Sequence, residues 1–213
     1  MDTVVYFVRH SETCPKANLK FITDEGSSQF DNEKVFLSVK GEKKAEVLSK
    51  NSELKNIDAV YSSDYVRALE TAKYFANENN TIINVDERLG ERKIGNTSGL
   101  DMKEFHILQN NDFDYKLPGG ESLNQTKKRM TNAVKNILMF EAGNRVLVVS
   151  HSTALTCLLS AWCSQGKNYD GDIILSYNDQ TVIDGHFTAP MVFKVVFDGM
   201  NVKSVEYLNI VED

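Results

Sequence analysis

Two histidines in this 213-residue chain each follow an apolar segment, at positions that could support phosphoryl chemistry. His10, preceded by Arg9, comes directly after the apolar run 3–8, and His151 comes just after the run 145–149. A neutral imidazole can attack phosphorus, and a guanidinium can hold phosphoryl oxygens through paired hydrogen bonds. An Arg-His pair at a strand end is usually solvated or structural, and His151 alone could be a satisfied core histidine. The pattern therefore needs supporting residues nearby before it indicates catalysis.

Arg67 and Glu91 are the supporting candidates. Arg67 lies one helical turn after Ser62-Ser63, which follows the apolar run 59–61. Glu91 belongs to a charged segment that follows the run 81–85. Taken singly, an arginine in such a position is more often a salt-bridge residue on a helix, and a glutamate in a charged loop is more often solvated. Parallel strands bring their carboxyl ends to one edge of a sheet, where ligands bind in α/β folds, so all these residues would meet there.

The alternation of apolar strands and amphipathic helices predicts an α/β fold with a mostly parallel central sheet and helices on both faces. Antiparallel strands are expected late in the chain, where Asp198-Gly199 fits a hairpin turn. Ser38, Asp64 and Ser122 are plausible helix N-caps. No linker-like segment divides the chain, so we expect a single domain over residues 1–213. The expected strands are 3–8, 59–61, 81–85, 145–149, 192–197 and 202–208, and the expected helices are 38–51, 64–77, 101–110, 122–141 and 153–162.

Composition and charge narrow the class of protein. The hydrophobic share of 41% is typical of a globular protein, no apolar run approaches the roughly 18 residues that span a bilayer, and no basic segment precedes the first apolar run. We therefore expect a cytoplasmic protein with no membrane partner. The net charge of −6 argues against nucleic acid as a partner, although a few arginines and histidines could still make one positive cleft. Cys14, Cys157 and Cys163 form no CxxC pair, so reduced thiols are expected in place of disulfides or a zinc cluster.

Five short segments carry a resemblance to a known family. Taken in order, they are Val8-Arg9-His10, residues 61–72 (YSSDYVRALETA), residues 89–95 (LGERKIG) with Gly99, residues 118–122 (PGGES), and residues 148–151 (VVSH). Together they resemble the histidine phosphatase superfamily, which includes the cofactor-dependent phosphoglycerate mutases. The resemblance runs from residue 3 to about residue 160. It implies a phosphoglycerate mutase-like fold that works without a metal or another cofactor.

The resemblance also implies a role for each candidate residue. His10 would attack phosphorus and form a phosphohistidine, with its other ring nitrogen donating to a backbone carbonyl. Arg9, Arg67 and a protonated His151 would hold the phosphoryl oxygens. Glu91, protonated at first, would give a proton to the leaving alkoxide and later take one from water.

Three positions depart from the family pattern. Ser11 stands where glycine usually follows the nucleophilic histidine, and glycine's freedom at positive φ is lost there. Lys16 stands where an asparagine is common, and Ser152 where glycine usually follows the second histidine. Lys16 and Ser152 are therefore candidate substrate-binding residues. Substrate selectivity is expected from the irregular segments 11–37 and 95–120.

The favoured function is hydrolysis of a small phosphorylated substrate, a phosphomonoester, by a monomer or homodimer. A phosphoglycerate mutase-type phosphotransferase is the alternative within the family. Mutases of the family carry a longer insert before the second histidine, whereas only the 28 residues 123–150 separate Ser122 from His151 here. A non-catalytic phosphate-binding regulatory module is an alternative from another class, which the changes at Ser11 and Ser152 support.

A metal-dependent phosphatase is less consistent with the sequence. Metal sites for phosphoryl transfer need clustered carboxylates and histidines. Asp112 and Asp114 form the nearest pair, with His106 upstream, and that segment is interpreted as a solvated helix end. His186 lies near an expected turn and is given no role.

Overall fold

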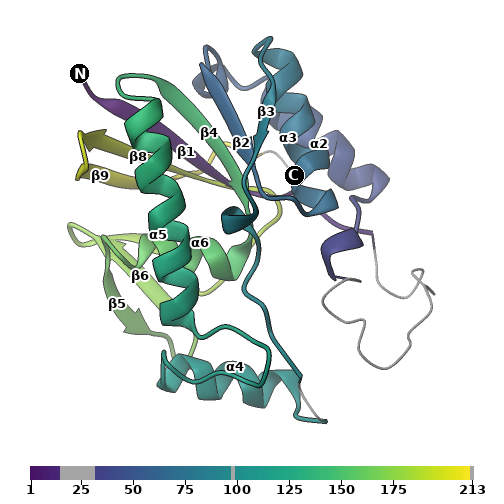
Figure 1. Ribbon diagram of the computed structural model, residues 1–213, viewed down its shortest axis with the longest axis vertical. Helices are drawn as coiled ribbons and strands as arrows, with labels where there is room; N and C mark the ends of the chain where they lie inside the picture. Colours follow the sequence, from purple (N-terminus) through teal and green to yellow (C-terminus); the bar gives the residue numbers. More distant parts are fainter. Residues whose placement is uncertain (15–31, 97–98, 212–213) are drawn as a thin grey trace.

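The structure is a computed structural model that describes residues 1–14, 32–96 and 99–211. Its centre is a sheet whose strands lie in the order β3-β2-β4-β1-β8-β9 (Figure 1). Four of these strands are parallel neighbours: β1 (Thr3–Arg9), β2 (Ala59–Ser62), β3 (Ile83–Val85) and β4 (Arg145–Ser150). The last two, β8 (Met191–Asp198) and β9 (Asn201–Leu208), are antiparallel, which confirms the predicted fold class.

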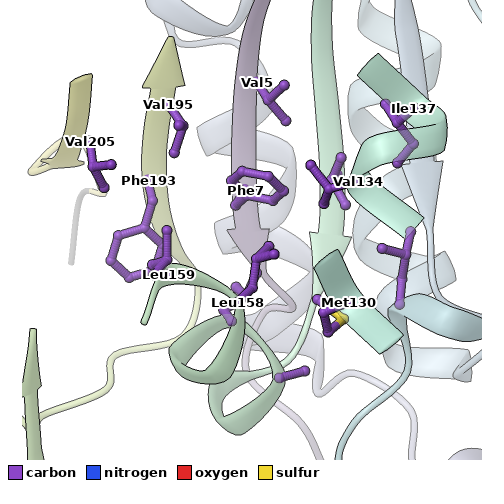
Figure 2. Packing of buried hydrophobic residues seen from close by; sticks show 14 of the residues in the cluster. Val5, Phe7, Met130, Val134, Ile137, Leu158, Leu159, Phe193, Val195 and Val205 are labelled. Atoms are coloured by element: carbon purple, nitrogen blue, oxygen red, sulfur yellow. The ribbon is translucent and has the colours of Figure 1, made fainter. Parts of the chain in front are cut away.

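Alternate residues of β1 face two separate cores, because successive side chains of a strand point to opposite faces of the sheet. Val5 and Phe7 pack with the residues of α5 (Leu123–Phe140), α6 (Ser152–Leu159) and β8 (Figure 2). Tyr6 and Val8 belong to the other cluster, with residues of α2 (Val39–Ser49) and α3 (Val66–Glu78). Both faces of the central strands are therefore buried, which explains why the sequences of these strands are continuously apolar.

Two of the three predicted N-caps are present. The Ser38 side chain accepts from the Gly41 amide, and Ser122 forms a capping box with Gln125. The prediction for Asp64 is wrong, because α3 begins at Val66 and its N-cap residue makes no side-chain capping bond. The Arg67 amide donates instead to the Val35 carbonyl at 3.1 Å, so a backbone group from an earlier loop replaces the side-chain cap.

The region after α6 contains a second sheet that the sequence did not resolve. Its antiparallel strands lie in the order β5-β6-β7, namely β5 (Ser164–Lys167), β6 (Ile173–Tyr177) and β7 (Gln180–Ile183). The predicted helix 153–162 ends earlier, at Leu159, because the chain turns into β5. The short helix α4 (Met102–Asn111) lies at the same end of the molecule as this sheet, and short 3-10 turns occur at Ser52–Leu54 and Glu87–Leu89 (Figure 1).

Candidate active site

The carboxyl ends of the parallel strands bring the candidate residues together. The His10 amide donates to the Ser150 carbonyl at 2.9 Å, and the Ser63 amide donates to the Val149 carbonyl at 3.2 Å. These bonds continue the strand pairing by one residue beyond β1 and β2. As a result, the centroids of the His10 and His151 rings lie 5.2 Å apart.

His10 is buried and oriented as a nucleophile requires. Its Nδ1 lies 2.8 Å from the Ser11 carbonyl oxygen, the bond expected for a ring that carries its proton on Nδ1 and keeps Nε2 as a lone pair. Burial lowers the pKa of His10 to about 3, and the nearby charges of Arg67 and Arg9 act in the same direction, against the bond to Ser11. The imidazole is therefore neutral at neutral pH.

Ser11 is accommodated without the backbone freedom of glycine. It is fully buried, and it is absent from the described residues with positive φ. Its amide donates to Thr71 Oγ1 at 3.0 Å, and its hydroxyl donates to the Gly41 carbonyl at 2.7 Å. A Cβ at Gly41 would lie 1.9 Å from the Glu12 carbonyl oxygen, so a glycine in α2 makes this close approach possible. The serine thus ties the His10 loop to α2.

His151 is held by a serine that follows β2. Ser63 Oγ lies 2.8 Å from His151 Nε2, and it also accepts the Tyr65 amide at 3.4 Å. A hydroxyl that accepts from the amide can donate its own proton to Nε2, and the ring proton of a neutral His151 then lies on Nδ1. Nδ1 is buried and has no hydrogen-bond partner within the described ranges.

The groups around His151 favour its neutral form, and a protonated His151 beside a bound phosphoryl group stays a prediction. Complete burial, followed by the positive charge of Arg67 and the proximity of His10 and Arg9, holds the pKa of His151 well below its ordinary value. A neutral ring with its proton on Nδ1 can still donate one hydrogen bond to an anion.

Arg67 and Arg9 are cations beside these rings. Arg67 is buried, donates through Nη1 to the Asn32 carbonyl, and places its Cζ 4.9 Å from the centroid of the Tyr65 ring. Arg9 donates through Nη1 to the Thr188 carbonyl at 2.8 Å, while its buried Nε has no partner in the described part of the chain. Neither guanidinium has a carboxylate at ion-pair distance among the described residues. A buried arginine and a half-buried one without a matching charge favour an anionic ligand.

Glu91 is fixed at the start of α6. Its carboxylate oxygens accept the amide protons of Arg92 at 2.8 Å, Ala154 at 2.9 Å and Thr153 at 3.3 Å. This fixes the carboxylate in position after η3 (Glu87–Leu89), close to the second-histidine segment.

Arg129 of α5 holds the loop that carries Glu91 through hydrogen bonds. Arg129 makes two hydrogen bonds to the Glu121 carboxylate, at 2.8 and 2.7 Å, and donates to the carbonyls of Arg88 and Gly90 at 2.7 and 3.1 Å. The segment after Glu91 also runs alongside residues 118–121, where the Glu121 amide donates to the Lys93 carbonyl at 2.8 Å. The PGGES segment therefore positions the acid loop.

A cavity of about 230 Å³ lies at this sheet edge. It is lined by His10, Arg67, Glu91 and Ser152, with other neighbours that include Arg92 and Thr153. His151 and Arg9 do not line it: His151 is fully buried beside the His10 ring. Lys16, the other candidate substrate-binding residue, lies outside the described residues. The sequence predicted no role for Ser63 or Arg92, although both lie within segments that resemble the family, 61–72 and 89–95.

The remaining polar candidates lie apart from this cavity. Asp112 is the C-cap of α4 and accepts the Asp114 amide at 2.9 Å, whereas His186 is exposed. Over the described ranges, no three His, Cys, Asp or Glu side chains gather as they would to hold a metal ion. No helix in those ranges is long and apolar enough to cross a membrane.

Comparison with known proteins gives concordant matches. The histidine phosphatase superfamily (branch 1) matches residues 5–185. A probable phosphoglycerate mutase GpmB from Escherichia fergusonii is 33% identical over 164 residues, covering 73% of each chain. A solved mycobacterial glucosyl-3-phosphoglycerate phosphatase has a TM-score of 0.66 at 18% identity, covering 99% of this chain and 98% of its own. The solved protein YhfR from Bacillus stearothermophilus has a TM-score of 0.59 at 25% identity, covering 87% of this chain and 98% of its own.

Proposed function

Because the chain belongs to the histidine phosphatase superfamily (branch 1), we propose that it hydrolyses small phosphomonoesters through a phosphohistidine on His10. The observation that carries this proposal is the bond between His10 Nδ1 and the Ser11 carbonyl, which leaves Nε2 free as a lone pair. The nucleophile lines one cavity with a buried arginine and a carboxylate. Positioning and charge stabilisation are most of what phosphoryl transfer requires of a protein.

In the first step, the bond between Nε2 and phosphorus forms while the bond from phosphorus to the leaving oxygen breaks. Arg67 stabilises the charge on the phosphoryl oxygens. Arg9 and Nδ1–H of His151, which do not line the cavity, must become accessible to these oxygens when the substrate binds in order to donate further hydrogen bonds. Glu91 must enter this step protonated, and it then gives its proton to the leaving oxygen. In the second step, water attacks phosphorus, Glu91 takes a proton from that water, and inorganic phosphate leaves with His10 restored.

Phosphoglycerate mutase-type transfer is the second candidate, and the name of the 33% identical relative favours it. A mutase must keep water away from the phosphohistidine until the second substrate position has reacted. The short stretch between Ser122 and His151 leaves less chain to cover the site, which supports the hydrolase. The regulatory module gains little support, because a neutral His10 beside Arg67 and Glu91 is a reactive arrangement.

The direct test measures release of inorganic phosphate from p-nitrophenyl phosphate, with a chelator present, for wild type and His10→Ala. We expect turnover by wild type that survives the chelator and is lost in His10→Ala. Incubation with 3-phosphoglycerate then separates the two candidates, because a hydrolase releases phosphate whereas a mutase produces 2-phosphoglycerate. Absence of wild-type turnover on either substrate across a broad pH range would contradict both.

A further inference from the structure

Tyr65 is a buried aromatic residue that the proposed reaction does not use. It is only 3% exposed and belongs to the apolar cluster on the side of the central sheet that α2 and α3 cover. It stands directly before α3 as the N-cap residue, and its side chain makes no capping hydrogen bond. Its carbonyl accepts the Ala68 and Leu69 amides at 2.9 and 3.0 Å, so the first turn of α3 fixes where the residue lies.

Two groups of the candidate site pack against the Tyr65 ring. The centroid of the His151 ring lies 4.6 Å from that of Tyr65, with the two planes tilted by 59°, and Arg67 Cζ lies 4.9 Å from the Tyr65 centroid. A tilted aromatic pair at this separation is attractive, and so is a guanidinium over a tyrosine ring, most of all where water is excluded. Both Arg67 and His151 are buried. The Tyr65 ring therefore restricts the positions that both side chains can take.

The loop that carries Glu91 also approaches this ring. A Cβ at Gly90, the residue before Glu91, would lie only 3.1 Å from Tyr65 Cε1, which is closer than an ordinary van der Waals contact. The φ of Gly90 is −63°, which residues other than glycine also adopt, so the glycine provides space there and not backbone freedom. The absence of a side chain at Gly90 thus lets the loop pack directly on Tyr65.

The Tyr65 backbone contributes to the same arrangement. Its amide donates to Ser63 Oγ at 3.4 Å, and that hydroxyl lies 2.8 Å from His151 Nε2. The amide thus helps to direct the hydroxyl towards the edge of the imidazole, while the phenol ring packs against the imidazole itself. One residue therefore contacts the second histidine, the serine that binds this histidine, the buried arginine and the loop of the acid.

Tyr65 lies behind these groups and not beside the substrate. Among the described residues, those that line the His10 cavity do not include Tyr65. It lines a different cavity, of about 240 Å³, together with Gly90 and Glu91. Any effect of Tyr65 on phosphoryl transfer must therefore pass through the groups that it contacts.

We propose that Tyr65 is a positioning residue for phosphoryl transfer. Before a substrate binds, its ring holds Arg67, His151 and the loop that carries Glu91 in the arrangement that the transferred phosphoryl group requires. This inference rests on the proposed function. Its physical basis is preorganisation. An arginine side chain loses rotational freedom when it binds an oxyanion, and a ring that already fixes the guanidinium removes part of that entropy loss.

The test compares two substitutions of Tyr65 with one of Phe75. Tyr65→Leu removes the ring and should lower kcat/KM for p-nitrophenyl phosphate about tenfold or more, because the contact with the guanidinium and the aromatic pair are both lost. Tyr65→Phe keeps the ring and should retain most of the wild-type kcat/KM. Phe75 is the matched control, since it is fully buried in the same cluster and lies about 12 Å beyond Arg67 along α3. Phe75→Leu should lower the free energy of unfolding and leave kcat/KM unchanged.

A double-mutant cycle separates positioning from a general loss of packing. If Tyr65 acts by holding Arg67, the loss of kcat/KM caused by Arg67→Ala should be several-fold smaller in the Tyr65→Leu background than in wild type. Independent losses that multiply in the double variant would overturn the proposal. An equal loss in Tyr65→Phe and Tyr65→Leu would overturn it as well, since the contacts of the ring would then not matter. If Tyr65→Leu does not fold, Tyr65→Met replaces it, because a methionine side chain adapts to irregular gaps.

A binding measurement distinguishes failure of this inference from failure of the proposed function. If wild type hydrolyses no ester, inorganic phosphate is titrated calorimetrically into wild type, Tyr65→Leu, Tyr65→Phe and Phe75→Leu. Binding that is about tenfold weaker in Tyr65→Leu alone supports the positioning role without turnover, because the buried arginine is then less well placed for the anion. Absence of phosphate binding by wild type, or equal affinity in wild type and Tyr65→Leu, contradicts it.

Discussion

The cavity at His10 and a neighbouring cavity of about 270 Å³ share Arg92, Ser152 and Thr153 but are built differently. Around His10, candidate site residues stand directly after parallel strands, and the bond from the His10 amide to the Ser150 carbonyl continues the strand pairing. The neighbouring cavity is formed largely by α4, α6, the β5–β6 turn and loops, and Asn110 of α4 donates to the Gly171 carbonyl of that turn. The sheet edge thus fixes the reacting groups, whereas peripheral elements shape what the neighbouring cavity can accept.

The largest expected effect comes from removing a cation beside His10. Arg67→Ala should lower kcat/KM by about 10³-fold, because a buried arginine that stabilises transferring phosphoryl oxygens can contribute that much. The loss should be similar for esters with different leaving groups, such as 3-phosphoglycerate and glycerol 3-phosphate. A substrate-dependent loss in Arg67→Ala would break the distinction between the two regions.

Glu91→Gln should have a somewhat smaller effect that depends on the leaving group. Proton transfer to an alkoxide contributes about 10²-fold at the low end of its usual range, so hydrolysis of glycerol 3-phosphate should fall by about that factor. Release of p-nitrophenolate, which leaves without needing a proton, should fall much less. Burst kinetics with p-nitrophenyl phosphate provide the measurement, and equal losses for both esters would argue against Glu91 as the acid.

Substitution of Ser63 should have a moderate effect on kcat, because Ser63 contacts His151. Ser63→Ala removes the hydroxyl at 2.8 Å from Nε2, so the ring proton is no longer directed to Nδ1. We expect about a tenfold loss of kcat, in line with one neutral hydrogen bond, and retention of most activity in Ser63→Thr. The NMR chemical shifts of the His151 ring nitrogens report the tautomer directly. An unchanged tautomer of His151 in Ser63→Ala would contradict this role of Ser63.

The last prediction concerns the stability of the fold against pH, and it leaves activity at neutral pH unchanged. His10 has a folded-state pKa of about 3, below its unfolded value near 6.5, so the unfolded chain binds more protons between these values. Stability should therefore fall as the pH drops from about 6.5 towards 3, by up to about 1.4 kcal/mol per pH unit for this one residue. His10→Asn should flatten the curve of unfolding free energy against pH. Parallel curves for wild type and His10→Asn would contradict a buried neutral His10.

Local signals in the sequence explain what could be predicted. The strands that surround β4 are apolar on both faces, and Ser38 and Ser122 cap their helices as their positions indicate. The meeting of His10, Arg67 and Glu91 at one cavity follows from parallel strand ends. The mostly parallel sheet with antiparallel strands late in the chain is confirmed.

Interactions between distant segments explain what could not be predicted. Residues 164–167 (SQGK) are exposed and lack apolar alternation, so nothing local indicates that they form β5. The first turn of α3 is capped by the Val35 carbonyl, which a search for capping side chains does not find. The burial of Arg92 depends on Gln109 and Phe105, which lie on a separate helix.

Trapping the covalent intermediate tests the central claim most directly. Wild type and His10→Ala are mixed with p-nitrophenyl phosphate, quenched in alkali, and digested for peptide mass spectrometry. Wild type should carry an acid-labile phosphoryl group on His10 that disappears as substrate is consumed, and His10→Ala should carry none. A phosphoryl group on another residue, or full turnover by His10→Ala, would contradict the account.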